Sequence, residues 1–143
     1  VAAQNYLAAY GNVRQLSFGM TDMAWHTLTE PFEGDVERFE AVSMAPTQVL
    51  PVVSGTAMAP AFGHIFSGGY AAGYYGYKWA EVLEADAFSL FKEKGIFNRE
   101  VASSFRENVL SKGGTEHPME LYVRFRGHKP ETKALIEKMG LGK

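Results

Sequence analysis

A glycine- and tyrosine-rich stretch from Gly63 to Trp79 constrains the fold of this chain more than any other segment. It reads GHIFSGGYAAGYYGYKW and contains five glycines and four tyrosines. A glycine inside a helix costs about 1 kcal/mol relative to alanine, so repeated glycines need a structural or functional reason. Because glycine has no Cβ, we expect this backbone to approach a ligand or another backbone closely.

The spacing of the tyrosines predicts a long helix that begins near Gly69 or Tyr70 and ends near Lys94. At about 100° per residue, Tyr70, Tyr74 and Tyr77 would share one narrow face of that helix. The adjacent face would carry small residues, namely Gly69, Gly73, Gly76 and Ala80. The small residues would leave a groove along the helix, and a row of phenol hydroxyls beside it could bind a peptide or stabilise an oxyanion. The alternative is purely structural, with half-buried tyrosines and a small-residue stripe that permits tight helix contacts.

Prolines, glycines and caps divide the rest of the sequence into further helices. Apolar residues at near-helical spacing stop before Pro31 and indicate one long helix or two in series. Pro46 is expected to kink or split the next helix, and a connector with a short extended segment follows at residues 51–60. The expected helices span residues 2–28, 35–49, 70–94, 98–110, 118–126 and 130–139. The predicted fold class is all-α, a bundle of about six or seven helices with a glycine-rich loop before a long central helix.

Composition excludes several classes of function. A net charge of −2 provides no basic surface, so nucleic acid is not an expected partner. The absence of cysteine excludes disulfides and thiolate metal sites. Charged residues from Lys78 onward leave no apolar run long enough to span a membrane. A Walker-type phosphate loop is also excluded, because Gly69 and Tyr70 stand where its lysine and Ser/Thr would be.

Few residues outside the tyrosine stretch indicate chemistry. No two of the four histidines have the spacing of a His-Glu-x-x-His zinc helix; they are His26, His64, His117 and His128. The acidic residues are expected mostly on solvated helix surfaces. His64 alone lies in a special setting, six residues before Tyr70, where a packing role and a ligand contact are both open. These residues predict a binding groove with hydrogen-bond donors and no group to activate a nucleophile.

The stretch from Phe62 to Val82, FGHIFSGGYAAGYYGYKWAEV, resembles the C-terminal signature of the thimet oligopeptidase family of zinc metallopeptidases. Other stretches resemble that family in the same order, including RQLSFG at 14–19, MAP at 44–46, GIFN at 95–98 and FRG at 125–127. The resemblance therefore covers nearly the whole chain. At His128 the family often has arginine, a departure that affects no expected site residue.

The resemblance implies roles for six residues of the stretch. Tyr70 and Tyr77 match the family's donors to the tetrahedral oxyanion, and His64 and Tyr74 match residues that contact the substrate near the scissile bond. Gly68 and Gly69 lie in a segment, Gly63–Gly69, that resembles a flexible loop ordering over bound peptide. The family's zinc-binding helix and further glutamate lie upstream of anything in this sequence. We therefore expect the chain, residues 1–143, to be the C-terminal substrate-binding part of a larger enzyme, without zinc and inactive by itself.

The expected partners follow from that interpretation. They are a short peptide substrate, the missing N-terminal half of the enzyme and, through apolar surface left uncovered, a second copy of the chain. A cytoplasmic location is expected, with a periplasmic one as the alternative. The rival interpretation of function is a non-catalytic helical module that binds peptides or proteins.

Overall fold

Seven α-helices and no β-strand are found among residues 6–141, which are the residues that the computed structural model describes. The predicted all-α class is confirmed, and no strand occurs at residues 51–60, where a short extended segment was expected. Within the described part of the chain, no helix has the length and apolar character needed to cross a membrane. The contacts group the chain into two units, one up to Lys78 and one from Trp79.

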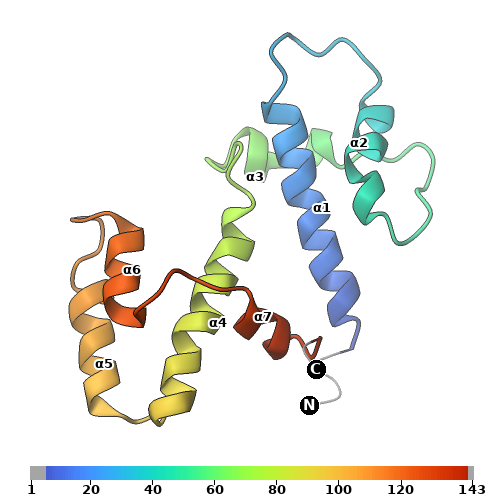
Figure 1. Ribbon diagram of the computed structural model, residues 1–143. Helices are drawn as coiled ribbons and strands as arrows, with labels where there is room; N and C mark the ends of the chain where they lie inside the picture. Colours follow the sequence, from blue (N-terminus) through green and yellow to red (C-terminus); the bar gives the residue numbers. More distant parts are fainter. Residues whose placement is uncertain (1–5, 142–143) are drawn as a thin grey trace. The chain divides into compact units, whose positions relative to one another are not determined.

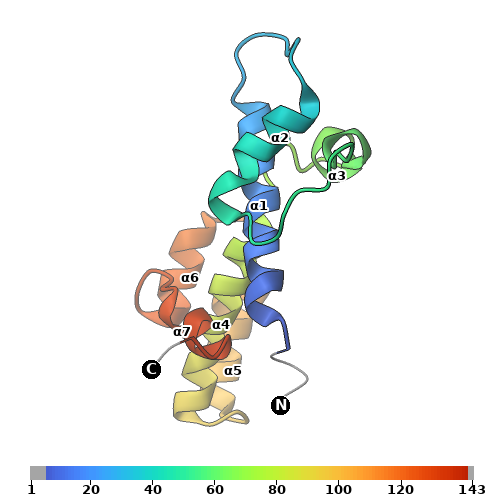
Figure 2. The same ribbon diagram turned by 90° about the vertical axis from the view of Figure 1, so that its right-hand side faces the viewer.

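The first unit is built on helix α1, Ala8–His26, against which α2, Val36–Met44, lies (Figures 1 and 2). The start of α1 differs from the expected residue 2, and residues 1–5 lie outside the described residues. Asp35 caps α2, accepting a hydrogen bond from the Arg38 amide at 2.9 Å. After α2 the chain forms a 3₁₀ turn, Ala45–Thr47, so Pro46 splits this helical segment as predicted.

Two glutamates of α2 hold the connector that leads to the glycine-rich stretch. The buried carboxylate of Glu40 accepts one hydrogen bond on each oxygen, from the amides of Met58 and Ala59, both at 2.9 Å. One turn earlier, Glu37 accepts from the Gly55 amide at 3.1 Å. The connector then forms a 3₁₀ turn, Ala59–Ala61, and the short helix α3, Gly63–Phe66. These bonds place the entrance to the stretch beside α2.

Helix α4, Gly76–Lys94, begins at the end of the first unit and continues as the main helix of the second. Its stop at Gly95 is as predicted, with a positive φ of 107°. Asn98 caps α5, Arg99–Phe105, through hydrogen bonds from the amides of Glu100 and Val101. A wider π-helical turn, Arg106–Leu110, continues α5 to the predicted end. The remaining helices are α6, Pro118–Arg126, and α7, Lys133–Lys138.

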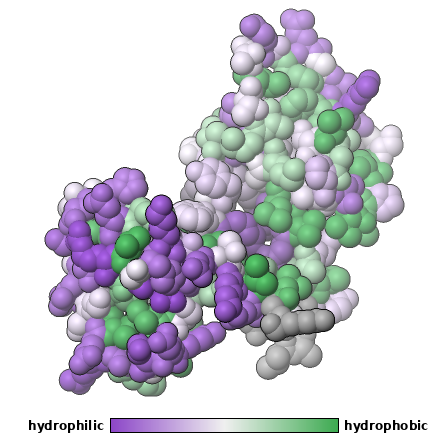
Figure 3. Space-filling model, viewed as in Figure 1, coloured by the Kyte–Doolittle hydropathy of each residue, from purple (hydrophilic) through white to green (hydrophobic). Residues whose placement is uncertain are grey.

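The core of the second unit consists of two small clusters. Ala87, Tyr122 and Phe125 form one, with side chains of α4, α5 and the π turn against it. Val82, Ala85 and Leu135 form the other, between α4 and α7. Beside them lies a buried polar group, in which the Tyr122 hydroxyl donates to Asp86 Oδ2 at 2.6 Å. Hydrophobic residues also reach the surface of both units, among hydrophilic ones (Figure 3).

Candidate functional site

The tyrosine stretch folds as a short helix and a series of turns before α4, and not as the continuous helix that the spacing predicted. Helix α3 packs into the first unit through Ile65, whose side chain is almost completely buried. Its neighbour His64 is exposed. Residues 71–75 form turns, and α4 begins only at Gly76. The predicted helical faces, one of tyrosines and one of small residues, are therefore wrong, since Tyr70, Tyr74, Gly69 and Gly73 all precede the helix.

Two glycines show why the chain cannot continue as a helix at this point. A Cβ added to Gly68 would lie 3.0 Å from the His64 carbonyl oxygen and 3.1 Å from that of Gly63. Gly69 has φ of +80°, a conformation that L side chains rarely adopt. The close approach that the glycines predicted is thus found, and here it is backbone against backbone.

The turns nevertheless bring the predicted site residues together in one cluster of rings in the first unit. Tyr70 and Tyr77 stack with ring centroids 5.2 Å apart and planes 23° from parallel. His64 lies 5.3 Å from the Tyr70 ring, and its Nε2 is 3.1 Å from the Tyr77 hydroxyl. Tyr70 and Tyr77 are each 41% exposed, so both rings are accessible from solvent. We refer to His64, Tyr70, Tyr74 and Tyr77 as the ring cluster.

Tyr74 differs from the other tyrosines because its hydroxyl points into the unit. The hydroxyl donates a hydrogen bond to Gln15 Oε1 of α1 at 2.9 Å. Its ring packs edge-on against Phe62 and Phe18, with centroids 5.3 and 5.8 Å away. Burial raises the pKa of Tyr74, an effect partly offset by the nearby Arg14 guanidinium and the bond to Gln15. Tyr74 therefore joins the ring cluster to α1, with its own proton already engaged.

Hydrogen bonding within the ring cluster raises the pKa of Tyr77. The hydrogen bond with the Tyr70 hydroxyl is the largest cause that raises the pKa of Tyr77, followed by desolvation and by the charges that Tyr70 and Tyr74 would carry. Because the ordinary value is 10.0, the phenol remains a hydrogen-bond donor at neutral pH. Such a pair of adjacent, accessible O–H groups can stabilise a developing negative charge on oxygen.

An acidic residue that the sequence analysis did not single out lies behind the ring cluster. Asp22 of α1 has no solvent-exposed surface. Its Oδ1 accepts a hydrogen bond from the Ala72 amide and its Oδ2 one from the Tyr74 amide, both at 2.9 Å. The only signal in the sequence was a carboxylate set among the apolar residues of a predicted helix. Asp22, Glu40 and Asp86 are thus buried exceptions to the expectation of solvated acids.

Among residues 6–141, no group of three His, Cys, Asp or Glu side chains is placed to hold a metal ion. His64, the histidine of the ring cluster, is within hydrogen-bond distance of a phenol. The residues described here therefore do not fit a zinc site, and what they offer is hydrogen-bond donation from phenols and an imidazole.

Comparison with known sequences agrees with the resemblance seen in the motifs. A model of peptidase family M3 matches residues 1–141. The chain is 49% identical to oligopeptidase A of Salmonella typhimurium and 48% identical to that of Escherichia coli, each over 143 residues and 99% of the chain. It is also 37% identical to a dipeptidyl carboxypeptidase of Salmonella typhimurium, over 92% of the chain. The chain spans 21% of the length of the two oligopeptidase A relatives. On these findings the chain belongs to peptidase family M3.

Proposed function

We propose that this chain is the C-terminal portion of a zinc-dependent oligopeptidase or peptidyl-dipeptidase that hydrolyses short peptides. In this proposal the chain supplies the groups that bind the substrate and stabilise the oxyanion. The observation that carries the proposal is the stacked pair Tyr70 and Tyr77, with His64 Nε2 at 3.1 Å from the Tyr77 hydroxyl. The zinc and the base that activates water would come from the rest of the enzyme, because the described residues do not provide a metal site.

The chemical role of the pair follows from where charge develops during peptide hydrolysis. Attack on the scissile carbonyl converts its oxygen to an oxyanion, and donors aimed at that oxygen stabilise the transition state more than the substrate. Tyr70 and Tyr77 would donate their O–H groups to it. His64 would hold the Tyr77 hydroxyl in place and contact the peptide beside it. Tyr74, whose proton is bonded to Gln15, would contribute its ring face and its position, while Gly68 and Gly69 shape the adjoining loop.

Phenylalanine substitutions in the complete enzyme test this role. Losing one oxyanion donor typically lowers kcat by about 10²–10³, so Tyr70→Phe and Tyr77→Phe should show this loss with KM nearly unchanged. Tyr75→Phe is a matched control, because Tyr75 is a neighbouring tyrosine that is 60% exposed and outside the ring cluster. A Tyr70→Phe enzyme with the kcat of the Tyr75→Phe enzyme would remove Tyr70 from the proposed role.

The chain by itself should not hydrolyse peptides. This expectation is tested by incubating the purified 143-residue chain, with added zinc, with a fluorogenic oligopeptide. Turnover proportional to the concentration of the chain would contradict it. A peptide that binds and is not cut, followed by tyrosine fluorescence, is the result expected of the substrate-binding part of the enzyme.

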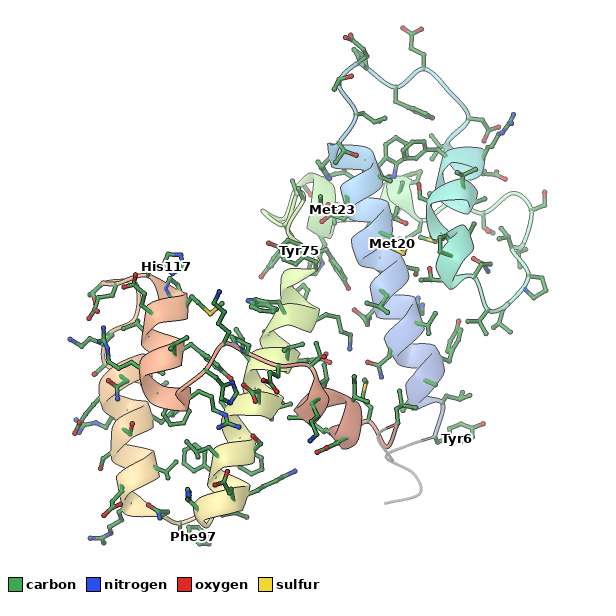
Figure 4. The ribbon with its side chains drawn as sticks, in the orientation of Figure 1. Tyr6, Met20, Met23, Tyr75, Phe97 and His117 are labelled. Atoms are coloured by element: carbon green, nitrogen blue, oxygen red, sulfur yellow. The ribbon has the colours of Figure 1, made fainter. Side chains whose placement is uncertain are left out.

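An exposed apolar face of α1 supports the proposal of a missing partner segment. Leu16, Met20 and Met23 lie at helical spacing and are 49%, 38% and 40% exposed; Figure 4 shows the two methionines on α1. Relatives about five times longer than this chain have the additional sequence to cover such a face. Without it, the isolated chain should self-associate through apolar surface. Light scattering should show dimers or larger species that Met20→Ser/Met23→Ser reduces, and a monomer at high concentration would count against this interpretation.

A further inference from the structure

We propose that Asp22 is a positioning residue for the oxyanion-stabilising tyrosines, acting as a clamp on the turn that separates Tyr70 from Tyr77. The inference rests on the proposed function, since it assigns a role in the reaction to a residue that does not reach the substrate. Asp22 lies on α1, fifty residues before Ala72, and its carboxylate joins that helix to the turn.

The two bonds of the clamp fall on the part of the stretch that has no helix to support it. Each oxygen of Asp22 accepts one backbone amide, those of Ala72 and Tyr74, at equal distances of 2.9 Å. The turn's other backbone bonds are local, from the amides of Gly73, Gly76 and Tyr77 to the carbonyls of Tyr70, Gly73 and Tyr74, respectively. Local bonds close a turn on itself, whereas the bonds to Asp22 fix the turn relative to α1. The clamp holds the backbone of the turn against α1, alongside the side-chain bond from Tyr74 to Gln15, and in this inference it sets where Tyr70 and Tyr77 lie.

Backbone strain shows that the turn needs such a clamp. Ala72 has φ of +52°, one of two positive values among the non-glycine residues described. An L-residue with a Cβ is disfavoured in this region, and it persists there only where the surroundings hold it. The Ala72 amide is one of the two groups bonded to Asp22. Without that acceptor the turn would be free to relax, and the ring of Tyr74, 5.2 Å from that of Tyr77, would move with it.

A histidine holds the carboxylate itself. His26, one turn along α1, has its Nδ1 2.8 Å from Asp22 Oδ1 and 2.9 Å from the Asp22 carbonyl oxygen. The His26 ring also lies 5.6 Å from that of Phe66, the last residue of α3. Asp22 and His26 together thus contact two of the segments that carry the ring cluster, namely α3 with His64 and the turn with Tyr74. A fully buried carboxylate with three donors around it has little freedom to rotate, which is what positioning requires.

The test compares Asp22→Asn with Glu40→Gln in the complete enzyme. Both residues are buried carboxylates of the first unit that accept two backbone amides at 2.9 Å. In each variant an NH₂ group would face one of those amides, so the loss of hydrogen bonding to the backbone is matched, although Asp22 also has His26 as a partner. Only Asp22 bonds to the tyrosine turn. Steady-state kinetics and hydrogen exchange of residues 70–77, followed by mass spectrometry, are measured for both.

We expect Asp22→Asn to lower kcat by about 100-fold, as displaced catalytic groups do, with KM within about two-fold. Exchange of residues 70–77 should accelerate. Glu40→Gln should change kcat by less than about two-fold and accelerate exchange only near residues 55–59, because it releases the connector and leaves the turn held. Equal kcat values for the two variants, or unchanged exchange at 70–77 in Asp22→Asn, would overturn the inference. If Asp22→Asn does not fold, Asp22→Glu keeps both acceptor oxygens and displaces the turn by one methylene, and the same two outcomes decide.

The Tyr70→Phe enzyme separates a failure of this inference from a failure of the proposed function. If Tyr70→Phe lowers kcat and Asp22→Asn does not, the tyrosine role stands and the positioning role of Asp22 fails. If Tyr70→Phe leaves kcat unchanged, the proposed function fails, and the exchange of residues 70–77 still decides whether Asp22 clamps the turn.

Discussion

Replacing Ala72 by glycine should stabilise the chain, although glycine usually has the opposite effect. Ala72 has φ of +52°, in the left-handed region that costs an L-residue about 1–2 kcal/mol and costs glycine nothing. Against this, glycine makes the unfolded chain more flexible, which costs about 0.4–1 kcal/mol. Ala72 is exposed, so the loss of its methyl group removes little buried apolar surface. The difference leaves a net stabilisation between about 0 and 1.6 kcal/mol, or about 0.8 kcal/mol at the middle of both ranges.

Urea denaturation measures this difference, and the adjacent alanine provides the control. Ala71 is also exposed and also lies in the turn, but its φ is not positive. Ala71→Gly should therefore lower the free energy of unfolding by about 0.4–1 kcal/mol, opposite in sign to Ala72→Gly. The midpoints should move in opposite directions at a constant slope. If Ala72→Gly destabilises the chain as much as Ala71→Gly, the backbone is not strained at Ala72.

Three further predictions concern the second unit. Asn98→Ala removes the cap of α5 and should lower the free energy of unfolding by about 1 kcal/mol, with Asn98→Gly closer to the original; equal losses in urea would contradict a capping role. Phe125→Ala should lower the free energy of unfolding by about 3–5 kcal/mol, because the ring is buried and lies 5.0 Å from that of Phe105. A decrease below about 1 kcal/mol in urea denaturation would show that the cluster around Phe125 is not a core. Burial and the hydrogen bond to Asp86 raise the pKa of Tyr122 above its ordinary value of 10.0, so its contribution to stability is fully present below pH 10 and is lost as the pH rises further. Unfolding free energies should therefore begin to fall as the pH rises above about 10 in the original chain and fall less in Tyr122→Phe. Parallel losses in the two chains would exclude this residue as the cause.

Several helix ends in the second unit could be predicted from the sequence because local signals determine them, although α7 begins at Lys133 and not at the expected residue 130. Asn98 accepts amides of the next turn, and Gly95 takes the positive φ that stops α4. Pro118 starts α6 as predicted, since the first turn of a helix does not need its missing N–H. Each signal acts within a few residues, so no knowledge of the folded chain was required.

The tyrosine stretch could be predicted only in part, because contacts distant in sequence determine its backbone. The spacing of Tyr70, Tyr74 and Tyr77 fits a helix, and the prediction that they come together was right. The helical path was wrong, because Gly68 approaches the Gly63 and His64 carbonyls and because Asp22 binds the turn from α1. Periodicity records which residues can share a face, and it contains no information about a carboxylate fifty residues away.

The long sequence separation of these bonds has a consequence for the order in which the chain folds. The hydrogen bonds from Ala72 and Tyr74 to α1 connect residues 50, 52 and 59 positions apart. Closing so long a loop costs conformational entropy before any contact repays it, so such contacts form late in folding. Helices α1 and α4 can form early from local bonds, but the tyrosines have no fixed arrangement until α1 docks. A partly folded chain would thus be rich in helix while its ring cluster is still unformed.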